Sequence, residues 1–580
     1  MAFDENKIQY DVVLVGASTS NLALAHRLVD LASHSGISFS MAILEKAREF
    51  GGQILSGAVT PTHVIDKLFP DWRETDFPVE GVCDESHFTV MGAERKWDAP
   101  NMLLPAGLDK KGYLIITLSQ VVAWMVDKLK AKLQDAPKVT VDFFNGFAAH
   151  EILYDNTDKV VGVRVSRTGI DVEDNIYAHV TVFGDKGFIS QDLVKKFNLR
   201  KNPQLWSVGV KEVWSIKQDL AGKVWHTLGF PLLDGTFGGG FIYGMQNNRL
   251  TVGLVVSLDS ENPNLNPQQL LQDYKTHPWL QDLLKDGTLL KYGAALLPEG
   301  GYFSLPDKFA VDGAMLLGDA LGTLNVIKLA GVDHAMECGW QAAGVLHKAL
   351  QTRQYDEATL IEYQHNLGHT FVMSDLHGSR YFRYTFQNNP KLLKEYVPKL
   401  ARGIDNDGHP FAAAIGLGLM NPIGAPWDGL KAKLFLDGWR DAGFIHYKKN
   451  YAEYEPDYVL PELAKYKKND HASKDTLYSR EDAVFYAGTK YHEGNDHIDE
   501  FDADVCVRCI DSYSIHGKTT PCVSDCTAEV HRIDEMEGRH LHGMSLENCI
   551  HCRTCEIVCP QENIRVKPTY QGSGPDFMGL

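Results

Sequence analysis

The sequence lacks any uninterrupted apolar run of about 18 residues, so we expect no membrane-spanning helix. The start, MAFDENKIQYDVVLVG, also lacks a basic stretch followed by an apolar core, and it is neither Arg-rich nor poor in acids. We therefore expect neither a secretory signal nor a transit peptide. We therefore expect a cytosolic, reducing compartment, where clustered cysteines bind metal more often than they form disulfides.

An excess of positive charge is missing as well. The formal net charge is −18, which argues against a nucleic-acid partner and is compatible with a partner protein that presents basic residues. The composition is otherwise that of an ordinary globular protein. Since the chain has 580 residues, we expect two or more packed units.

Cysteine is scarce until the last eighty residues. Only ten cysteines occur, and eight of them lie between Cys506 and Cys559. Residues 549–560 read CIHCRTCEIVCP, a C-x2-C-x2-C-x3-C-P motif. The first three thiolates of such a motif hold one iron–sulfur cube, and the fourth, before the proline, turns to a second cluster. This spacing predicts iron–sulfur ligation and one-electron transfer.

A second motif supplies the partner that the first one needs. CVRC at 506–509 and CVSDC at 522–526 give C-x2-C-x12-C-x3-C. The alternative is a pair of zinc knuckles, but the third cysteine of the later motif and its Cys-Pro ending favour iron–sulfur. Because fourth ligands are exchanged, we predict one cube on Cys526, Cys549, Cys552 and Cys555, and another on Cys506, Cys509, Cys522 and Cys559.

The front of the chain has an incomplete glycine fingerprint. A buried strand from Tyr10, a turn, a helix and a second strand ending at Glu45 have the geometry of a dinucleotide site. Gly16 is present, but Ser18 and Asn21 stand where the fingerprint has glycines. Ser18 is small enough to let a phosphate approach, whereas a side chain at 21 opposes close helix packing. The alternative is an ordinary βαβ unit without a nucleotide.

A later stretch favours the nucleotide. From Gly313, a strand leads to a turn at Gly318 and Asp319, a glycine-bearing loop and a helix. This resembles the second flavin contact of glutathione-reductase-type flavoproteins, in which the aspartate binds the ribityl chain and the helix N-terminus faces the isoalloxazine.

From about residue 8 to 580 the sequence resembles the electron transfer flavoprotein–quinone oxidoreductase family. The resemblance rests on segments that occur in the same order: EKAREFGGQILSGAVTP, LFPDWRE, LSQVVAWM, HVTVFGDKGFISQDLVKKFNLR, VGVKEVW, DGTFGGGFIYGM, GLVVSLDSENPNLNP, LNVIKLAGVDHAM and ENCIHCRTCEI. It implies a glutathione-reductase-type α/β (α+β) FAD-binding fold with an inserted quinone-side domain. It also implies one [4Fe–4S] cluster, on the set that contains Cys526; the other four cysteines are extra and give a two-cluster, ferredoxin-like end.

The resemblance also implies site residues. Two adjacent glycines that approach the quinone correspond to Gly238 and Gly239, although a tight turn without ligand is the alternative for this run. No catalytic residue is nominated. The FAD contacts correspond to Gly16, Glu45, Gly57, Gly318 and Asp319, with Ser18 added from the fingerprint.

The family resemblance and the cysteine motifs also indicate the domain limits. We expect a flavoprotein body over 1–490, with FAD-binding parts at about 8–190 and 311–400. Quinone- and membrane-side parts are expected at about 191–310 and 401–447, a connecting stretch at 448–490, and the ferredoxin-like domain at 501–580.

The segment from His409, HPFAAAIGLGLMNPIGAPWDGL, is apolar and too short to span a bilayer. It is expected to lie on the membrane with Trp427 at headgroup level, or else to form a buried helix and a loop.

The leading expectation is a peripheral flavoprotein on the cytoplasmic face of a bacterial inner membrane. It would move electrons from electron transfer flavoprotein, or a similar donor, through FAD and two [4Fe–4S] clusters to membrane quinone. One alternative is a redox-relay subunit of a larger complex with a degenerate flavin site, which the altered fingerprint favours. The other is a flavin-dependent prenyl reductase.

Overall fold

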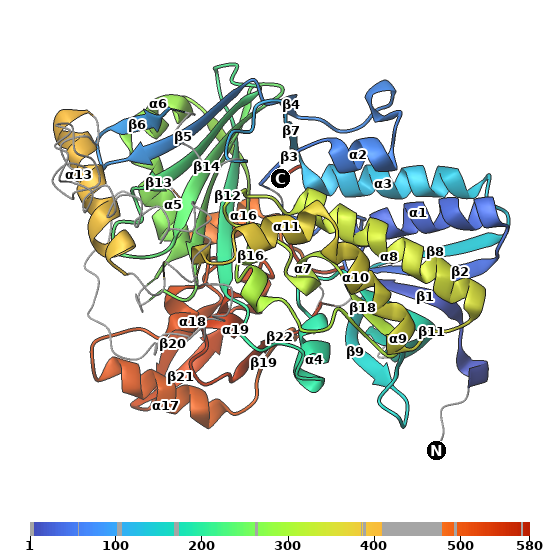
Figure 1. Cartoon of the computed structure of the whole chain (residues 1–580). Coiled ribbons are helices and arrows are strands. Elements are labelled where there is room, and N and C mark those ends of the chain that lie inside the picture. The colour runs from blue at the N-terminus through green and yellow to red at the C-terminus, as the bar shows by residue number, and fades with distance from the viewer. Residues whose placement is uncertain are drawn as a thin grey trace, which may run out of the picture.

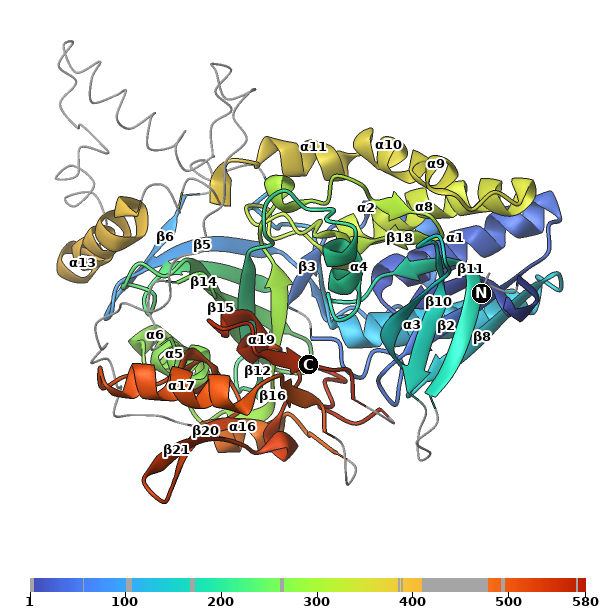
Figure 2. The same ribbon diagram turned by 90° about the horizontal axis from the view of Figure 1, so that it is seen from below.

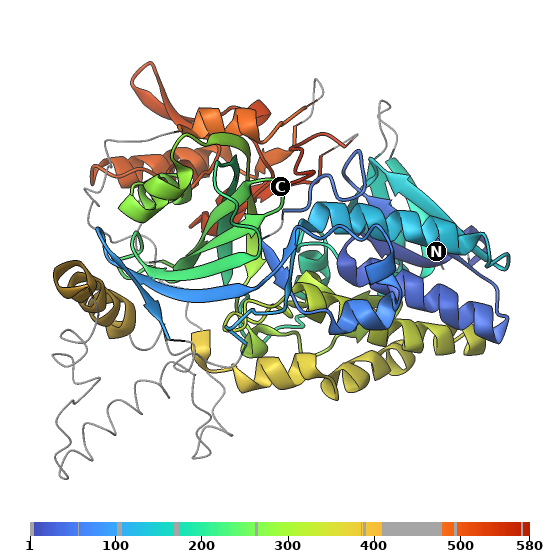
Figure 3. The ribbon, with the colours of Figure 1, turned by 90° about the horizontal axis from the view of Figure 1, so that it is seen from above.

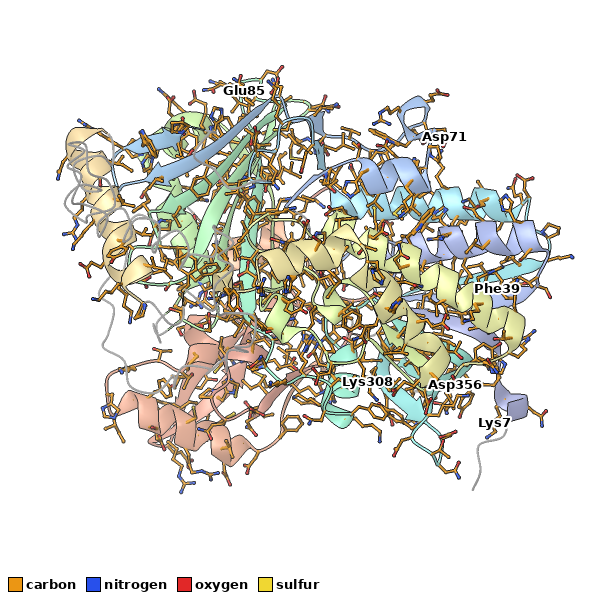
Figure 4. All side chains as sticks on the ribbon, viewed as in Figure 1. Lys7, Phe39, Asp71, Glu85, Lys308 and Asp356 are labelled. Atoms are coloured by element: carbon orange, nitrogen blue, oxygen red, sulfur yellow. The ribbon has the colours of Figure 1, made fainter. Side chains whose placement is uncertain are left out.

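The computed structural model describes residues 5–580 except 56, 101–106, 167–172, 261–264, 384–385, 387–389, 409–477, 492–495 and 570–571. Its described parts form two large β-sheets and a third, cysteine-bearing unit (Figure 1). Glu85, which begins one sheet strand, and Asp356, which caps a helix beside the other sheet, lie in different halves of the body (Figure 4).

The first sheet is built around the N-terminal strand. The parallel core runs β18 (Ala314–Leu316), β11 (Glu173–Phe183), β1 (Tyr10–Val15), β2 (Phe39–Glu45) and β8 (Val139–Asn145). The apolar run in β1 is buried on both faces, as a central parallel strand requires. β17 (Ala310–Val311) adds an edge, and β9 (Ala148–Tyr154) and β10 (Val160–Ser166) pair in antiparallel fashion onward from β11.

Three helices cover this sheet. α1 (Thr19–Ser35), α3 (Leu118–Leu133) and α8 (Val332–Thr352) lie side by side over it (Figure 1). The shorter helices around them are α2 (His63–Leu68), α4 (Ser190–Lys196), α7 (Gly318–Leu321), α9 (Glu357–Leu360), α10 (Glu362–Gly368) and α11 (Phe371–Gly378).

The second sheet has the order β16 (Thr288–Pro298), β12 (Trp206–Ser215), β15 (Arg249–Ser257), β14 (Gly238–Met245), β13 (Lys223–Gly229), β5 (Glu85–Met91) and β6 (Lys96–Ala99). All pairs are antiparallel except β13 with β5. Figure 2 shows α5 (Pro267–Lys275) and α6 (Pro278–Leu284) on one face, and α13 (Val397–Asp407) lies near β6 at the far end.

A small sheet of β3 (Ala58–Thr60), β7 (Leu114–Ile116) and β4 (Gly81–Val82) lies between the two halves. β5 and β6 join the second sheet although they precede residue 190, so the chain passes between the halves early.

The cysteine-bearing unit packs against the second sheet. It contains α16 (Arg480–Tyr486), β19 (Ile498–Glu500), α17 (Ala503–Ser514), α18 (Pro521–Ser524), β20 (His531–Met536), β21 (Arg539–Met544), α19 (Thr554–Val558) and β22 (Ile564–Val566). Figure 3, seen from above, shows this orange and red unit beside the green strands of the second sheet. Tyr292 of β16 is fully buried in this contact, and its hydroxyl donates to the Thr527 carbonyl at 3.2 Å.

The end of the chain returns to the first half of the molecule. The amide of Phe577 donates to the Gly52 carbonyl at 2.7 Å, and the amide of Gly579 donates to the Ser119 hydroxyl at 3.1 Å. Leu580 is fully buried. The cysteine-bearing unit is therefore held at both the second sheet and the first.

No helix among the described residues is long and apolar enough to cross a membrane. The segment from His409, with its two interpretations, lies outside the described residues, as does most of the expected connecting stretch.

Candidate functional site

A cavity of about 280 Å³ lies where β1 and β2 of the first sheet meet β16 of the second. Of the predicted FAD contacts, it is lined by Gly16, Ser18, Glu45, Gly57 and Asp319. Gly318 lies just outside the lining, with a φ of +56°. A β-carbon there would lie 3.0 Å from the Ser20 hydroxyl, so glycine lets this turn approach α1 closely.

The turn after β1 presents the start of α1 to the cavity. Gly16 has a φ of +86°, which favours glycine, and its amide donates to the Leu44 carbonyl at 2.9 Å. Ser18 caps α1, and its hydroxyl accepts from the Asn21 amide at 3.4 Å. Free N–H groups and the positive end of the helix dipole make this turn suitable for a pyrophosphate.

Asn21 is accommodated in a way that the fingerprint does not foresee. Its side-chain amide is buried and donates to the carbonyls of Val15 at 3.0 Å and Gly16 at 2.8 Å. A β-carbon at Gly184, after β11, would lie 2.5 Å from the Ser18 hydroxyl and 2.6 Å from the Asn21 side chain. A glycine that directly follows the neighbouring strand thus provides the space that the missing glycines of the turn would have given.

Glu45 ends β2 as predicted, and only 7% of its surface is exposed. One carboxylate oxygen accepts from the Ala17 amide at 3.2 Å, and the other accepts from the Ala47 amide at 2.8 Å. These bonds fix the side chain beside the glycine turn. Its remaining acceptor positions suit the hydroxyls of a ribose.

Three aspartates, Asp185, Asp319 and Asp333, line the cavity. Burial raises the pKa of Asp319, and the charge of Lys186 partly offsets this. Asp185 and Asp333 also line the cavity, and each has a buried carboxylate oxygen without a hydrogen-bond partner. Such unpartnered acceptors require donors. The hydroxyls and ring N–H of FAD supply them, so the residues present fit this cofactor.

Sequence reasoning did not single out Asp185, Lys186, Asp333 or Gly184. Their only signal in the sequence is their position: Gly184, Asp185 and Lys186 come directly after β11, and Asp333 lies in the first turn of α8. Their proximity to the glycine turn depends on strand and helix pairing that a local motif does not contain.

The cysteine set that contains Cys526 lies beside this cavity, and Cys552 lines it. Burial raises the pKa of Cys549, and the neighbouring Cys552 and Cys526 add to this. Burial also raises the pKa of the Cys555 thiol, and the charges of Cys549, Cys552 and Cys526 raise it further. Donors already point at the sulfurs: the Val530 amide reaches Cys526 at 3.2 Å, and the hydroxyls of Thr527 and Thr554 each reach Cys552 at 3.3 Å.

The second predicted set lines a separate, smaller cavity containing Cys506, Cys509, Cys522 and Cys559. Burial raises the pKa of Cys522 to about 12, and its three neighbours in the set contribute. Asn563 donates twice, from its side chain to Cys506 and from its backbone to Cys559, each at 3.2 Å. The structure therefore brings together the same two groups of four that spacing predicted.

The first cysteine set is held against the flavin cavity by Arg553. Its guanidinium donates to the Gly187 carbonyl at 2.5 Å, pairs with Glu556 at 2.9 Å and lies 4.4 Å from the centre of the Phe188 ring. Only 5% of Arg553 is exposed. Gly187 and Phe188 follow Asp185 and Lys186, which line the flavin cavity after β11, so one side chain joins the two sites.

Gly238 and Gly239 do not line the flavin cavity. They begin β14 and pair with Val256 and Val255 of β15, so the alternative of a tight turn is wrong. Two residues further along, Phe241 would lie 3.0 Å from a β-carbon at Gly57, which does line the cavity. β14 is thus in contact with the wall of the cavity.

A nucleotide-type first sheet, a cavity with a helix N-terminus and buried acids, and a thiolate set against its wall together define an iron–sulfur flavoprotein. The fold agrees with a solved structure, a geranylgeranyl bacteriochlorophyll reductase-like protein from Thermoplasma acidophilum. The TM-score is 0.54 at 15% identity, with 75% of this chain and 99% of the other covered.

The chain belongs to the electron transfer flavoprotein–ubiquinone oxidoreductase family. It is 31% identical to the mitochondrial member of Arabidopsis thaliana, over 98% of this chain and 84% of the relative. It is 30% identical to the probable member of Acinetobacter baylyi, over 100% of both, and 30% identical to that of Pseudomonas aeruginosa, over 99% of both.

Two family models match in the places where the structure has its second sheet and its cysteine-bearing unit. Residues 206–297 match "ETF-QO, ubiquinone-binding". Residues 476–578 match "Electron transfer flavoprotein-ubiquinone oxidoreductase, 4Fe-4S". The family resemblance seen in the sequence is confirmed, as are the flavoprotein fold and a [4Fe–4S] domain at the C-terminal end.

Proposed function

We propose that this chain is an electron transfer flavoprotein–ubiquinone oxidoreductase that takes electrons from electron transfer flavoprotein and delivers them to ubiquinone through FAD and iron–sulfur centres. The observation that carries this function is the shared wall: Cys552 of one thiolate set lines the cavity that also contains Gly16, Glu45 and Asp319. An iron–sulfur centre and a flavin held there are direct neighbours, as electron transfer between them needs.

The residues of the chain bind and orient the cofactors and exclude water from them. The start of α1 suits the pyrophosphate, Glu45 the adenosine ribose and Asp319 the ribityl chain. Bound FAD accepts electrons singly or in pairs, which matches one-electron clusters to two-electron quinone chemistry. Burial and the hydroxyl donors at Cys552 tune the potential of the neighbouring cluster.

The second thiolate set is proposed to hold a second [4Fe–4S] cluster. Four cysteines share one cavity, and Asn563 and Thr520 place polar contacts at their sulfurs. With a zinc ion instead, this site would carry no electrons. A cluster there lengthens the path from the protein donor to FAD.

Quinone is proposed to bind beside Gly238 and Gly239. Support comes from the ubiquinone-binding match over 206–297, which includes β14, and from the contact of Phe241 with Gly57. Because its acceptor is a lipid, we place the protein on the cytoplasmic face of a bacterial inner membrane, bound through the 411–427 segment. Bacterial relatives over their full length support this setting.

The relay-subunit alternative depends on a degenerate flavin site. Gly184 weakens this alternative, because it gives the Ser18 and Asn21 side chains the room that they need in the turn. The extra cysteine set still favours assembly into a larger redox complex. The prenyl reductase alternative is supported only by a similar fold at 15% identity, and a similarity at that level does not indicate a shared activity.

The test is anaerobic electron transfer with purified holoprotein. Reduced electron transfer flavoprotein and ubiquinone are mixed with the protein, and quinol is measured. We expect catalytic quinol formation that needs all three components. Reduction of the bound flavin without quinol formation would support the relay subunit instead.

A further inference from the structure

Lys46 lies where the flavin cavity meets the cysteine-bearing unit. It directly follows Glu45 at the end of β2, and it lines the cavity together with His551 and Cys552 of that unit. The Lys46 ammonium lies 3.4 Å from the Nδ1 atom of His551. Because His551 stands between Cys549 and Cys552, one side chain of the first half reaches the loop that carries two cysteines of the set with Cys526.

The ammonium of Lys46 is held on its other sides as well. The side-chain carbonyl of Gln53 accepts from it, and the side-chain nitrogen of Gln53 donates to the Ser573 carbonyl at 2.8 Å. The ammonium also lies 5.0 Å from the centre of the Phe188 ring, which lines the cavity. These contacts fix the position of the charge, so it acts on its surroundings without rearrangement.

His551 connects this charge to the sulfur ligands. Its backbone amide donates to the Cys549 sulfur at 3.4 Å, and only 9% of His551 is exposed. A ring nitrogen of His551 and the Cys549 sulfur lie within 4.8 Å of each other. The Lys46 charge therefore faces the flavin cavity and also contacts the loop around the sulfurs.

Among the residues that the structure describes, no carboxylate forms an ion pair with Lys46, whose contacts are an amide oxygen, an imidazole and an aromatic ring. The neighbouring cation, Arg553, differs because it pairs with Glu556 at 2.9 Å. Burial lowers the pKa of Lys46 to about 8, and the charges of Glu45 and Cys549 oppose that shift, so the ammonium form prevails at pH 7.

A charge removed from water needs a counter-charge. A [4Fe–4S] cluster on four thiolates is anionic, and so is FAD with its pyrophosphate. Each becomes more negative when it takes up an electron. The two cofactors that this junction fits are therefore the anions that balance the Lys46 charge.

We propose that Lys46 is a counter-ion shared by FAD and the cluster on the Cys526 set, and that its charge raises the reduction potential of both centres. This rests on the proposed function. In the step concerned, one electron leaves the reduced cluster and enters FAD, while Lys46 exchanges no proton and forms no bond. Because the cation stabilises the electron before and after the transfer, it keeps both centres reducible with little change in the driving force between them.

The variants are Lys46→Met, which removes the charge at a similar side-chain length, and Lys46→Arg, which keeps the charge. Lys130→Met on α3, where half of the lysine side chain is exposed, is the matched control. FAD and iron are first quantified in each holoprotein. The midpoint potential of FAD is then measured by anaerobic spectroelectrochemical titration at pH 7, and that of the cluster by EPR of samples frozen along the same titration.

We expect both midpoint potentials to be more negative in Lys46→Met. The expected change is roughly tenfold in the equilibrium constant for each electron, which corresponds to about 59 mV. Lys46→Arg should keep both potentials close to those of the wild type, and Lys130→Met should not change either. A side chain that only held the loop in place would not lower both potentials according to charge.

Unchanged potentials in Lys46→Met, a change at only one of the two centres, or an equal change in Lys46→Arg would overturn the proposal. Should Lys46→Met retain too little FAD, Lys46→Gln serves in its place under the same criteria. A wild-type protein that makes no quinol would contradict the proposed function alone, because the potentials are measured without donor or quinone.

Discussion

At the scale of single residues, Asn21 and Gly184 together take the structural role that the glycines of an intact fingerprint have in this turn. The Asn21 amide ties down the carbonyls of Val15 and Gly16, and Gly184 leaves room for it. A glycine at 21 would leave both carbonyls without these donors, so it would not improve the site. The altered fingerprint therefore forms the same turn with different residues.

Asn21→Ala should therefore lower both FAD affinity and thermal stability. The Gly16 carbonyl loses its donor, at about 1–3 kcal/mol for a group left unsatisfied, whereas the Val15 carbonyl keeps the Gly184 amide at 3.1 Å. FAD titration of apoprotein and a thermal melt check this, with Asn156→Ala in an exposed turn as the control. An unchanged melt together with tighter FAD binding would show that the fingerprint rule holds here after all.

Asp319→Ala should reduce FAD occupancy while leaving the apoprotein as stable as before or more so. The pKa of this carboxyl is raised because burial destabilises its charged form. A hydrogen bond from a flavin hydroxyl is expected to compensate for that loss of hydration. The lost charge-assisted bond is worth about 1.5–3 kcal/mol of binding. Occupancy at limiting FAD is measured against the exposed Asp307→Ala; equal occupancy would remove Asp319 from the site.

Lys110, before β7, is only 1% exposed, and its burial gives a pH-dependent stability prediction. Its pKa falls from 10.5 to about 8 on folding because it is buried, so the folded state resists its protonation. This destabilisation is absent above about pH 10.5 and grows as the pH falls towards 8. Lys110→Met should then be more stable than wild type by roughly 3 kcal/mol at pH 7 and by less at pH 9.5. Denaturant unfolding at the two pH values checks this, and a gain that is independent of pH would contradict it.

At the scale of elements, the contact of α1 with α8 sets the position of the phosphate-binding turn. Gly339 of α8 lies against the start of α1, where a β-carbon would come within 2.0 Å of the Ser20 carbonyl oxygen. A backbone oxygen cannot move aside without moving the helix.

Gly339→Ala should push α1 from α8, cost about 1–3 kcal/mol or more, and weaken FAD binding. Gly344→Ala, one and a half turns along the same helix, is the matched control: its β-carbon would meet only a guanidine nitrogen at 3.9 Å. It should be neutral or stabilising by up to about 1 kcal/mol. Equal behaviour of the two variants in melts and FAD titrations would refute this packing argument.

The elements also show what a sequence can predict. The spacing of the cysteines predicted both groups of four, because their ligand geometry is local to short motifs. Glu45 and Asp319 were predicted because each ends or follows a strand of recognisable pattern. Asp333, Gly184 and the placement of β5 beside β13 were not, because they depend on pairings between segments far apart in the chain.

At the scale of the whole molecule, three sites lie along one body. The second thiolate set is at the end of the cysteine-bearing unit, the first set meets the flavin cavity, and β14 contacts the cavity wall. Buried contacts from Arg553, Tyr292 and the chain end hold the unit in place. The arrangement is that of a relay from a protein donor to a lipid acceptor.

Cys559→Ser tests the exchange of fourth ligands at this scale. Cys559 belongs to the later motif in sequence but shares its cavity with Cys506, Cys509 and Cys522. EPR of the reduced protein should show the signal of that cluster changed and that of the Cys526 cluster kept. A change confined to the Cys526 cluster would mean that each motif ligates its own cluster.

The central claim is that one chain carries an FAD and two [4Fe–4S] clusters in a single relay. The most direct measurement is an anaerobic reductive titration of the purified, reconstituted protein, counting electrons taken up per chain. The account predicts about four, two for FAD and one for each cluster. An uptake of about three, with full FAD and cluster occupancy of the Cys526 set, would contradict the second cluster and with it the extended relay.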